Sequence, residues 1–343
     1  MGQRRARERP NHSLERTRPA RRENSVVTWP ARSARGRWAA KPRETTRIME
    51  TSVVRVLKFG DEVALEAFLL PRVESSMFLI GNMRAAGLVD NGQTYQGTYA
   101  ARLEDGKIVG VVAHYWNQNL VLQAPVDLMA LCAEAVKGSG RPIRGLVGPS
   151  DQVEVAKRAL GIDGSNAQMD ETEKLYSLDL GGLVVPGILA SGKVKGRRIE
   201  YGDVDLLTEW RTAYAVEALG AGDGLELRQQ CRQESERSVR EKRTWVLEDE
   251  GRPVACSSFN TAIEEAVQVG GVWTPPDLRR RGYGRAVVAA SLLDARTEGA
   301  RKGILFTGEE NIAAQKAYEA LGFRCIGDYS IVLLRSPLEY TVW

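Results

Sequence analysis

Histidine is nearly absent from this sequence: His12 and His114 are the only two among 343 residues. The sequence therefore offers almost no residues for histidine-based metal sites or Ser-His-Asp triads. Cysteines stand far apart and form no Cys-x-x-Cys pair, which argues against a zinc site or a disulfide framework and fits a reducing cytoplasm. They are Cys132, Cys231, Cys256 and Cys325. No run approaches the ~18 apolar residues of a membrane helix, and no apolar segment follows the basic N-terminus. We therefore expect a cytoplasmic protein that uses no metal and no membrane.

Charge is distributed unevenly along the chain. Residues 1–48 hold 14 Lys and Arg against four Glu, a net charge of +10, whereas residues 49–343 hold 34 basic and 40 acidic residues, a net charge of −6. The overall value of +4 thus hides a basic leader on a mildly acidic body.

The leader, residues 1–48, is rich in Arg, Pro and Ser and has almost no periodic apolar pattern. Such a segment buries too little apolar surface to offset its ordering entropy, so we expect disorder. Met49, directly before the first expected strand, could also be the actual start of the protein. The alternative is a nucleic-acid-binding arm, because clustered Arg side chains contact phosphates. We favour the disordered extension and consider nucleic acid an unlikely partner.

From residue 52 onward, apolar runs typical of strands alternate with patterns typical of helices, which predicts an α/β or α+β fold. The order is similar on both sides of a segment rich in Gly, Val and Pro at 181–195, so we predict two tandem copies of one mixed-sheet domain. The expected parts are the leader 1–48, an N-terminal domain 49–180, a linker 181–195 and a C-terminal domain 196–343.

The predicted strands lie at 53–59, 98–103, 108–115, 144–148, 173–180, 197–201, 244–247, 253–260, 266–274, 303–307 and 324–334. The predicted helices lie at 61–70, 124–137, 152–160, 204–218, 225–242, 282–298 and 311–321.

A basic, glycine-containing turn follows the strand that ends at Thr274. Pro275 and Pro276 cannot continue ladder hydrogen bonds, so they force the chain out of the sheet. The next residues are Arg279-Arg280-Arg281-Gly282-Tyr283-Gly284-Arg285, and an apolar helix follows. Glycines allow close approach of a bulky anion, and the helix start offers free N–H groups. The pattern predicts a pyrophosphate cradle, although a plain tight loop would also fit it.

Two motifs at family-like spacing make the prediction specific. Arg279-x-x-Gly282-x-Gly284, after Val272-Trp273-Thr274-Pro275-Pro276, resembles the coenzyme A signature of the GNAT acetyltransferase superfamily, in its Val-Tyr-Thr-Pro-Pro variant. Downstream, Asn311, Ala314 and Tyr318, followed by Gly322-Phe323, resemble the family's second motif. The N-terminal half has no Arg-x-x-Gly-x-Gly, and we interpret it as a degenerate copy.

The resemblance implies acetyl-CoA as acyl donor, with no metal. The residues implied to bind it are Val272, Trp273, Thr274, Arg279, Arg280, Arg281, Gly282, Tyr283, Gly284, Arg285, Asn311, Ala314 and Tyr318. It also implies a backbone oxyanion donor near 272–274, where the family's strand splays.

Tyr318 is the candidate general acid, since it lies seven residues after Asn311 on the same helix face and a phenol stays protonated at neutral pH. A tyrosine that only packs on the sheet, and an Asn311 that only caps its helix, are the alternatives. The general base is open between Glu264 and Glu265 before the central strand, a water chain, and Glu248 and Glu250, which a surface turn explains well; we name Glu265 as the candidate. Trp210, Tyr214 and Trp245 could line an acceptor pocket, but such aromatics are more often core. Cys256 and Cys325 are expected to be buried packing residues.

The function that the sequence favours is N-acetyl transfer to a primary amine, either a small molecule or an amine of a protein or peptide. The acidic body mildly favours a cationic acceptor. The main alternative is a coenzyme A-binding sensor without catalysis; nucleic-acid binding by the leader and aminoacyl transfer from a charged tRNA are weaker ones. Acceptor, acyl preference and oligomeric state are not readable from the sequence.

Overall fold

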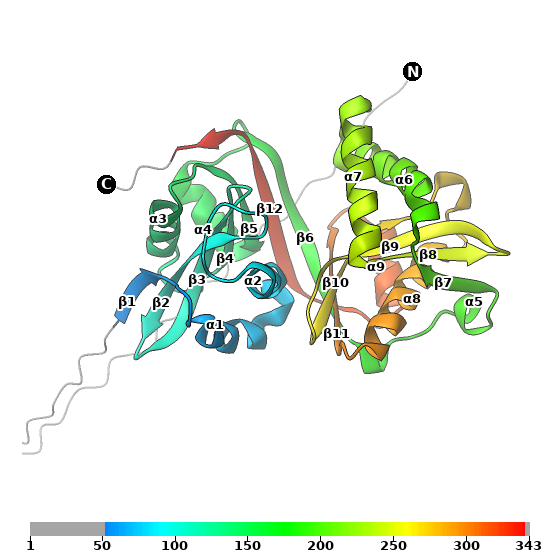
Figure 1. The fold of residues 1–343 in the computed structure, drawn as a ribbon, viewed down its shortest axis with the longest axis horizontal. Helices are drawn as coiled ribbons and strands as arrows, with labels where there is room; N and C mark the ends of the chain where they lie inside the picture. The colour runs from blue at the N-terminus through cyan, green and yellow to red at the C-terminus, as the bar shows by residue number, and fades with distance from the viewer. Residues whose placement is uncertain (1–51, 340–343) are drawn as a thin grey trace, which may run out of the picture. The chain divides into compact units, whose positions relative to one another are not determined.

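Strands from both halves of the chain join in one mixed sheet of twelve strands (Figure 1). The computed structural model describes residues 52–339, except for the side chains of residues 218 and 219, so the basic leader predicted at 1–48 lies outside the described residues. The described residues belong to one compact unit. The strand order is β1-β2-β3-β4-β5-β12-β6-β11-β10-β9-β8-β7.

The first half contributes β1 (Ser52–Val56), α1 (Glu62–Leu69), η1 (Leu70–Arg72), α2 (Val73–Ala86), β2 (Gly97–Glu104), β3 (Lys107–Tyr115), β4 (Asn119–Gln123), α3 (Leu128–Ser139), β5 (Ile143–Pro149), α4 (Ser150–Leu160) and β6 (Ala167–Asp179). The sequence analysis missed two of these elements, α2 and β4. Helix α2 buries Met77, Leu79, Ile80 and Met83, so its apolar residues cover too wide an arc to give a clear amphipathic pattern.

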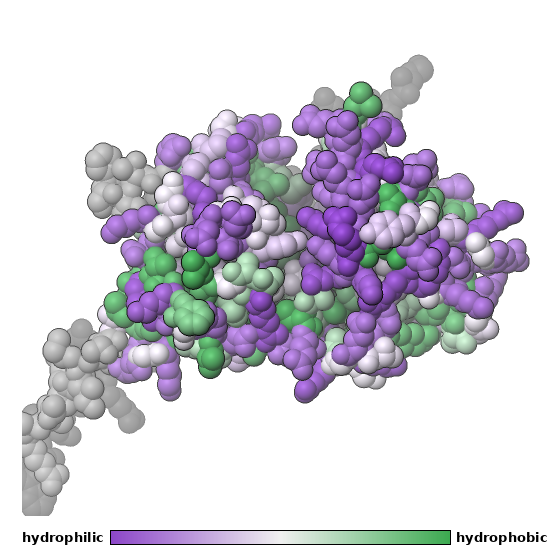
Figure 2. Space-filling model, in the orientation of Figure 1, coloured by the Kyte–Doolittle hydropathy of each residue, from purple (hydrophilic) through white to green (hydrophobic). Residues whose placement is uncertain are grey.

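The second half contributes η2 (Leu180–Gly182), α5 (Gly187–Ala190), β7 (Val194–Arg198), η3 (Tyr201–Asp203), α6 (Val204–Leu219), α7 (Leu225–Glu241), β8 (Thr244–Asp249), β9 (Arg252–Ala262), β10 (Ala266–Trp273), η4 (Pro276–Leu278), α8 (Tyr283–Thr297), β11 (Lys302–Gly308), α9 (Ile312–Glu319) and β12 (Arg324–Leu338). Helix α7 is strongly charged and buries only Cys231, Ser235 and Val239, and its outer surface is correspondingly hydrophilic in Figure 2.

The two halves repeat one another in residue detail at their first turn. Arg55 on β1 forms two hydrogen bonds of 2.7 and 2.8 Å with Asp61, six residues later and directly before α1. Arg197 on β7 forms the same pair, at 2.7 and 2.9 Å, with Asp203, directly before α6. In both copies the aspartate also accepts a backbone N–H from three residues upstream. This identity confirms two tandem domains and is a residue-level signal that the sequence analysis overlooked.

The central hairpins of the two halves use the same two-residue turn. Asp105-Gly106 connects β2 to β3 with φ angles of 47° and 78°, and Glu250-Gly251 connects β8 to β9 with φ angles of 50° and 77°. Positive φ at both positions is the geometry that matches the twist of a hairpin. The hairpins predicted around these residues are confirmed.

The last strand of each half pairs with strands of the other half. Strand β6 ends the first half but pairs antiparallel with β11 of the second half along its Glu173–Asp179 segment. Strand β12 ends the second half and lies between β5 and β6, antiparallel to both. Figure 1 shows these two long strands side by side at the centre of the molecule. Each half therefore needs a strand from the other to complete its sheet.

Helices cover both faces of each half. In the first half α3 packs on β2 and β3, whereas α1 and α2 contact β3 and β4. In the second half α8 packs on β8 and β9, and α6 contacts β10. Among residues 52–339 no helix combines the length and apolar composition needed to cross a membrane.

Candidate active site

Strands β10 and β11 separate halfway along their length. They pair in parallel only from Ala266–Lys302 to Val269–Leu305. Beyond this point β11 pairs only with β6, and the register of β10 with β9 shifts between Gly270 and Trp273, where Gly271 has a φ of 57°. Main-chain groups of residues 270–273 on the β11 side therefore have no strand partner, and they remain available to a ligand.

A tight turn connects the end of β10 to α8. Pro275 and Pro276 lead into the short helix η4, and Gly282 then precedes α8 with a φ of 82°, a conformation that favours glycine. No side chain caps α8, so its first N–H groups have no partner within the helix and carry the positive end of its dipole. A Cβ on Gly284 would make an ordinary van der Waals contact with Thr274 Oγ1, at 3.4 Å.

The four arginines of the turn divide into two kinds. Arg279 is used internally: its Nε donates to the Thr274 carbonyl at 3.0 Å, it pairs with Glu217 at 2.7 Å, and it lies over the Trp273 ring at 4.8 Å. Arg280, Arg281 and Arg285 form no ion pair with any carboxylate of the described residues. The start of α8 is therefore a basic surface with free N–H donors, which is the chemistry of an anion site.

Other residues predicted to bind the ligand have structural tasks. The Tyr283 hydroxyl donates to Asp249, and its buried ring fixes α8 on the sheet. Trp273 is 7% exposed and packs edge-on against Tyr214, with ring centroids 6.1 Å apart. Val272 is half-buried against the core under α8. Asn311 accepts a hydrogen bond from Ala314 N at 3.1 Å and caps α9.

Tyr318 lies on α9, edge-on to Phe323 at 6.0 Å between ring centroids. Burial raises the pKa of its phenol, and nearby Tyr214 and Glu173 raise it further. Its hydroxyl has no hydrogen-bond partner among residues 52–339. The group is therefore a protonated donor with no structural task of its own.

The structure does not bring Glu265 to this place. Glu265 lies directly before β10, at the end of the strand opposite to Thr274. Arg84 of α2 holds its carboxylate in hydrogen bonds of 2.7 and 3.0 Å and lowers its pKa.

Glu173 is the carboxylate that the sequence analysis missed. It lies on β6, half-buried, directly opposite Gly308 of β11 and Tyr329 of β12. Burial raises its pKa, and so does the like charge of Glu171. Because it lies 145 residues before Tyr318 in the sequence, only the strand exchange brings the two together. An acidic run on a strand, 170–173, was the one available signal.

The expected burial is confirmed for Trp210, Trp245 and Cys256, but not for Tyr214 and Cys325. Trp210 and Trp245 are core residues, whereas Tyr214 is only half-buried and contacts Trp273. Cys256 is buried, and burial raises its pKa to about 12. Cys325 is exposed, so the prediction that it is buried was wrong; it lies in the exposed first part of β12.

The first half has no equivalent basic turn. Residues 124–127 connect β4 to α3 directly, without glycine, where the second half has residues 274–282. The N–H of Ala124, at the end of β4, donates to Gln152 Oε1 at 2.7 Å. A side chain of α4 thus satisfies the backbone donor at the strand end, which is consistent with a copy that lacks an anion site.

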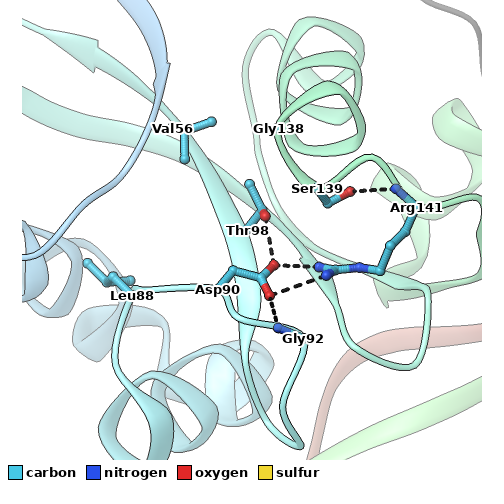
Figure 3. A pocket seen from close by; sticks show the side chains of 8 residues that line it. All are labelled: Val56, Leu88, Asp90, Gly92, Thr98, Gly138, Ser139 and Arg141. Carbon is cyan, nitrogen blue, oxygen red and sulfur yellow. Dashed lines mark hydrogen bonds and ion pairs between the residues drawn. The ribbon is translucent and has the colours of Figure 1, made fainter.

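A cavity of about 390 Å³ does exist in the first half, distant from this turn (Figure 3). Its charged groups satisfy each other: Arg141 bonds the Asp90 carboxylate at 2.5 and 3.2 Å, and Thr98 and Gly92 donate to the same carboxylate. No group of three or more His, Cys, Asp or Glu side chains suited to a metal occurs in the described part of the chain.

Comparison with known proteins finds a family model that matches part of the chain and solved structures with a similar fold. Residues 205–323 match the model of the acetyltransferase (GNAT) family. A solved Drosophila protein aligns with a TM-score of 0.56 at 13% identity, covering 82% of this chain and 99% of its own. A GCN5-related N-acetyltransferase from Sphaerobacter thermophilus has a TM-score of 0.49 at 13% identity, covering 85% and 97%. A tandem GNAT protein from the clavulanic acid biosynthesis pathway has 0.49 at 14%, covering 84% and 100%. A search of curated proteins found no match.

Proposed function

We propose that this chain, whose residues 205–323 match the model of the GNAT acetyltransferase family, transfers the acetyl group of acetyl-CoA to a primary amine. The acceptor is a small amine or an amine of a protein or peptide. The observation that carries the proposal is the uncapped, basic start of α8 beside the point where β10 and β11 separate.

The residues of the turn fit the pyrophosphate of coenzyme A. Backbone N–H groups at 282–285 would hold the phosphate oxygens, and Arg280, Arg281 and Arg285 would add charge-assisted hydrogen bonds. Arg279 would act by shaping the turn, because Glu217 and Thr274 already engage its guanidinium. The absence of a Cβ at Gly282 and Gly284 keeps this surface open.

The separated part of β10 would bind the acyl end of the donor. An unpaired main-chain N–H of residues 272–274 would donate a hydrogen bond to the acyl oxygen and stabilise its negative charge. Tyr318 would give its proton to the departing sulfur, since its raised pKa keeps the phenol protonated at neutral pH. Asn311 would order the first turn of α9, on which Tyr318 is placed.

We propose, as the sequence suggested, that only one of the two domains binds the coenzyme. Residues 196–343 carry the coenzyme site, and residues 49–180 are a copy that has lost it. Their connection, 181–195, contains η2 and α5. The exchanged strands add a task for the first half, because β6 completes the sheet beside β11.

The test is calorimetric titration of acetyl-CoA into the full chain and into its Gly284→Trp variant. The indole would fill the surface at the start of α8, so we expect binding to be lost. Gly164→Trp is the matched control, because Gly164 lies in a loop with open space around it and needs no positive φ. Equal binding by all three proteins would place the donor elsewhere. Absence of binding to the unchanged protein would contradict acetyl transfer. Binding without transfer to any amine would identify a coenzyme A sensor instead.

A further inference from the structure

Glu173 reaches the candidate active site because the two halves exchange strands. Strand β6 belongs to the first half, but its Glu173–Asp179 segment pairs with β11, and Glu173 lies opposite Gly308, the last residue of that strand. Beyond Leu305, β11 has left β10 and has only β6 as its neighbour. Glu173 is thus placed beside the opening between β10 and β11 by a strand that is not part of the GNAT-matching segment.

The residue opposite Glu173 also anchors the helix that carries Tyr318. The Gly308 carbonyl accepts hydrogen bonds from Asn311 N and from Gln315 Nε2, both at 3.0 Å. Helix α9 therefore begins at the position where β6 presents Glu173. The charge of Glu173 acts on the phenols of both Tyr318 and Tyr214 and raises their pKa, so the three groups are near neighbours. They come from three elements, β6, α9 and α6.

Neighbouring charges have partners that Glu173 lacks. Lys174 binds Asp328 at 2.9 Å and Glu309 at 3.1 Å, and Lys302 pairs with Glu74 of α2. Arg279 of the turn before α8 binds Glu217 of α6, and Arg211 of α6 donates to Ser238 of α7 at 2.7 Å. Glu173 forms no hydrogen bond or ion pair with the residues that the structure describes, although it is half-buried. The groups that face it are Glu171, Tyr214, Tyr318 and Tyr329.

We propose that Glu173 is the general base of this enzyme, supplied to the second domain by the first. The assignment rests on the acyl transfer proposed above. A half-buried carboxylate without a cationic partner serves no stabilising purpose, since its burial costs free energy that nothing in the fold returns. Beside an acyl donor it can remove a proton, and the environment that disfavours its charge also makes it a stronger base.

Glu173 takes one proton from the ammonium form of the acceptor, directly or through one water, and later releases it to solvent. The neutral amine nitrogen then forms a C–N bond to the acyl carbon. The C–S bond breaks with its electron pair on sulfur, and Tyr318 gives that sulfur its proton. The proton that the new amide nitrogen loses passes through water to the Tyr318 phenolate. The products are the amide and the free thiol of coenzyme A, with no oxidant or reductant.

The first arm of the test measures release of free thiol from acetyl-CoA with n-butylamine, 1,4-diaminobutane and a lysine-containing tripeptide. Glu173→Gln should lower kcat/KM by about 10²- to 10⁴-fold with these charged amines. It should also abolish the acidic limb of the pH profile, and it should leave the calorimetric affinity for acetyl-CoA within twofold. Hydroxylamine, which is largely uncharged at neutral pH, should be affected much less, because it has no ammonium proton to lose first.

The second arm uses Glu171→Gln as a neighbouring control on the same strand. Glu171 raises the pKa of Glu173 by its like charge, so its removal should move the acidic limb to lower pH without loss of the maximal rate. A merely structural carboxylate at 173 would not produce this shift.

The outcomes separate the two proposals. If the unchanged protein transfers acetyl groups and Glu173→Gln retains both the rate and the acidic limb, the base assignment is overturned and the acyl transfer stands. If the unchanged protein binds acetyl-CoA but releases no thiol with any of these amines, acyl transfer and the base fall together. Equal urea midpoints of the variants and the unchanged protein exclude misfolding as the cause of a lost rate.

Discussion

At the scale of single residues, His114 couples stability to pH. It is fully buried on β3, its Nδ1 lies 2.7 Å from Ser139 Oγ, and burial together with the charge of Arg141 lowers its pKa from 6.5 to about 4. The unfolded chain therefore binds a proton between pH 6.5 and 4 that the folded chain does not bind. The free energy of unfolding should therefore be unaffected by His114 above pH 6.5. As the pH falls from 6.5 to 4, it should decrease progressively, by about 3 kcal/mol in all.

Urea unfolding at pH 7, 6 and 5 measures this loss, with His114→Gln as the comparison. The variant should be less stable at pH 7 but should depend less steeply on pH in this range. Parallel slopes for the two proteins would show that other groups, such as the carboxylates, govern the acid sensitivity.

Tyr318 is a residue whose hydroxyl can be removed with little structural consequence. Because the hydroxyl bonds to none of the described residues and the ring contacts Phe323, Tyr318→Phe should change stability by less than about 0.5 kcal/mol. Its kcat should fall by about 10²-fold or more while acetyl-CoA affinity stays the same, since only the leaving sulfur loses its proton donor. Steady-state kinetics and calorimetry together measure both quantities. An unchanged kcat would leave Tyr318 a packing residue only.

At the scale of elements, α9 depends on its N-cap. It is a helix of eight residues, Asn311 is the one side chain that caps it, and the Gly308 carbonyl accepts the Asn311 N–H. Asn311→Ala should cost about 1 kcal/mol of unfolding free energy and weaken catalysis by loosening the turn before Tyr318, whereas Asn311→Asp should retain the cap. Thermal unfolding and kcat of the two variants test this expectation. Equal losses in both variants would assign the effect to a contact of the Asn311 amide nitrogen and not to the cap.

Elements that carry local signals were predictable from the sequence. Proline after β10, glycine at 282 and 284, and an apolar run fixed the strand, turn and helix within one residue of their observed bounds. The partners of β6 and β12 were not predictable, because a strand's sequence states which of its faces is buried but not which strand lies beside it. For the same reason the carboxylate beside the end of β11 was missed: Glu265 is close in sequence to β10, whereas Glu173 lies opposite Gly308 of β11 only through the strand pairing.

At the scale of the whole molecule, the exchanged strands should make the two domains unfold together. Asp61 and Asp203 hold equivalent turns at the two ends of the sheet, and Arg55 lowers the pKa of Asp61 to about 2. Asp61→Asn and Asp203→Asn should each cost about 1–3 kcal/mol, because each leaves a hydrogen-bonded arginine without its carboxylate.

Each substitution should shift one common transition, whichever half it lies in, because β12 lies between β5 and β6. Urea unfolding followed by tryptophan fluorescence and by far-ultraviolet circular dichroism tests this, since both signals should change at the same midpoint. Two transitions, with only one of them moved by each variant, would show that the halves are independent despite their shared strands.

The exchange also sets an order of events during synthesis. Strand β12 is the last of the described strands to leave the ribosome, and until it arrives β5 and β6 each have an unpaired edge facing the position that it will fill. Translation adds about 5–20 residues per second, so roughly 150 residues separate the emergence of β6 from that of β12 and the open edges persist for many seconds. Open strand edges pair readily with other chains. The nascent first domain is therefore a substrate for chaperones until the second domain returns a strand to it.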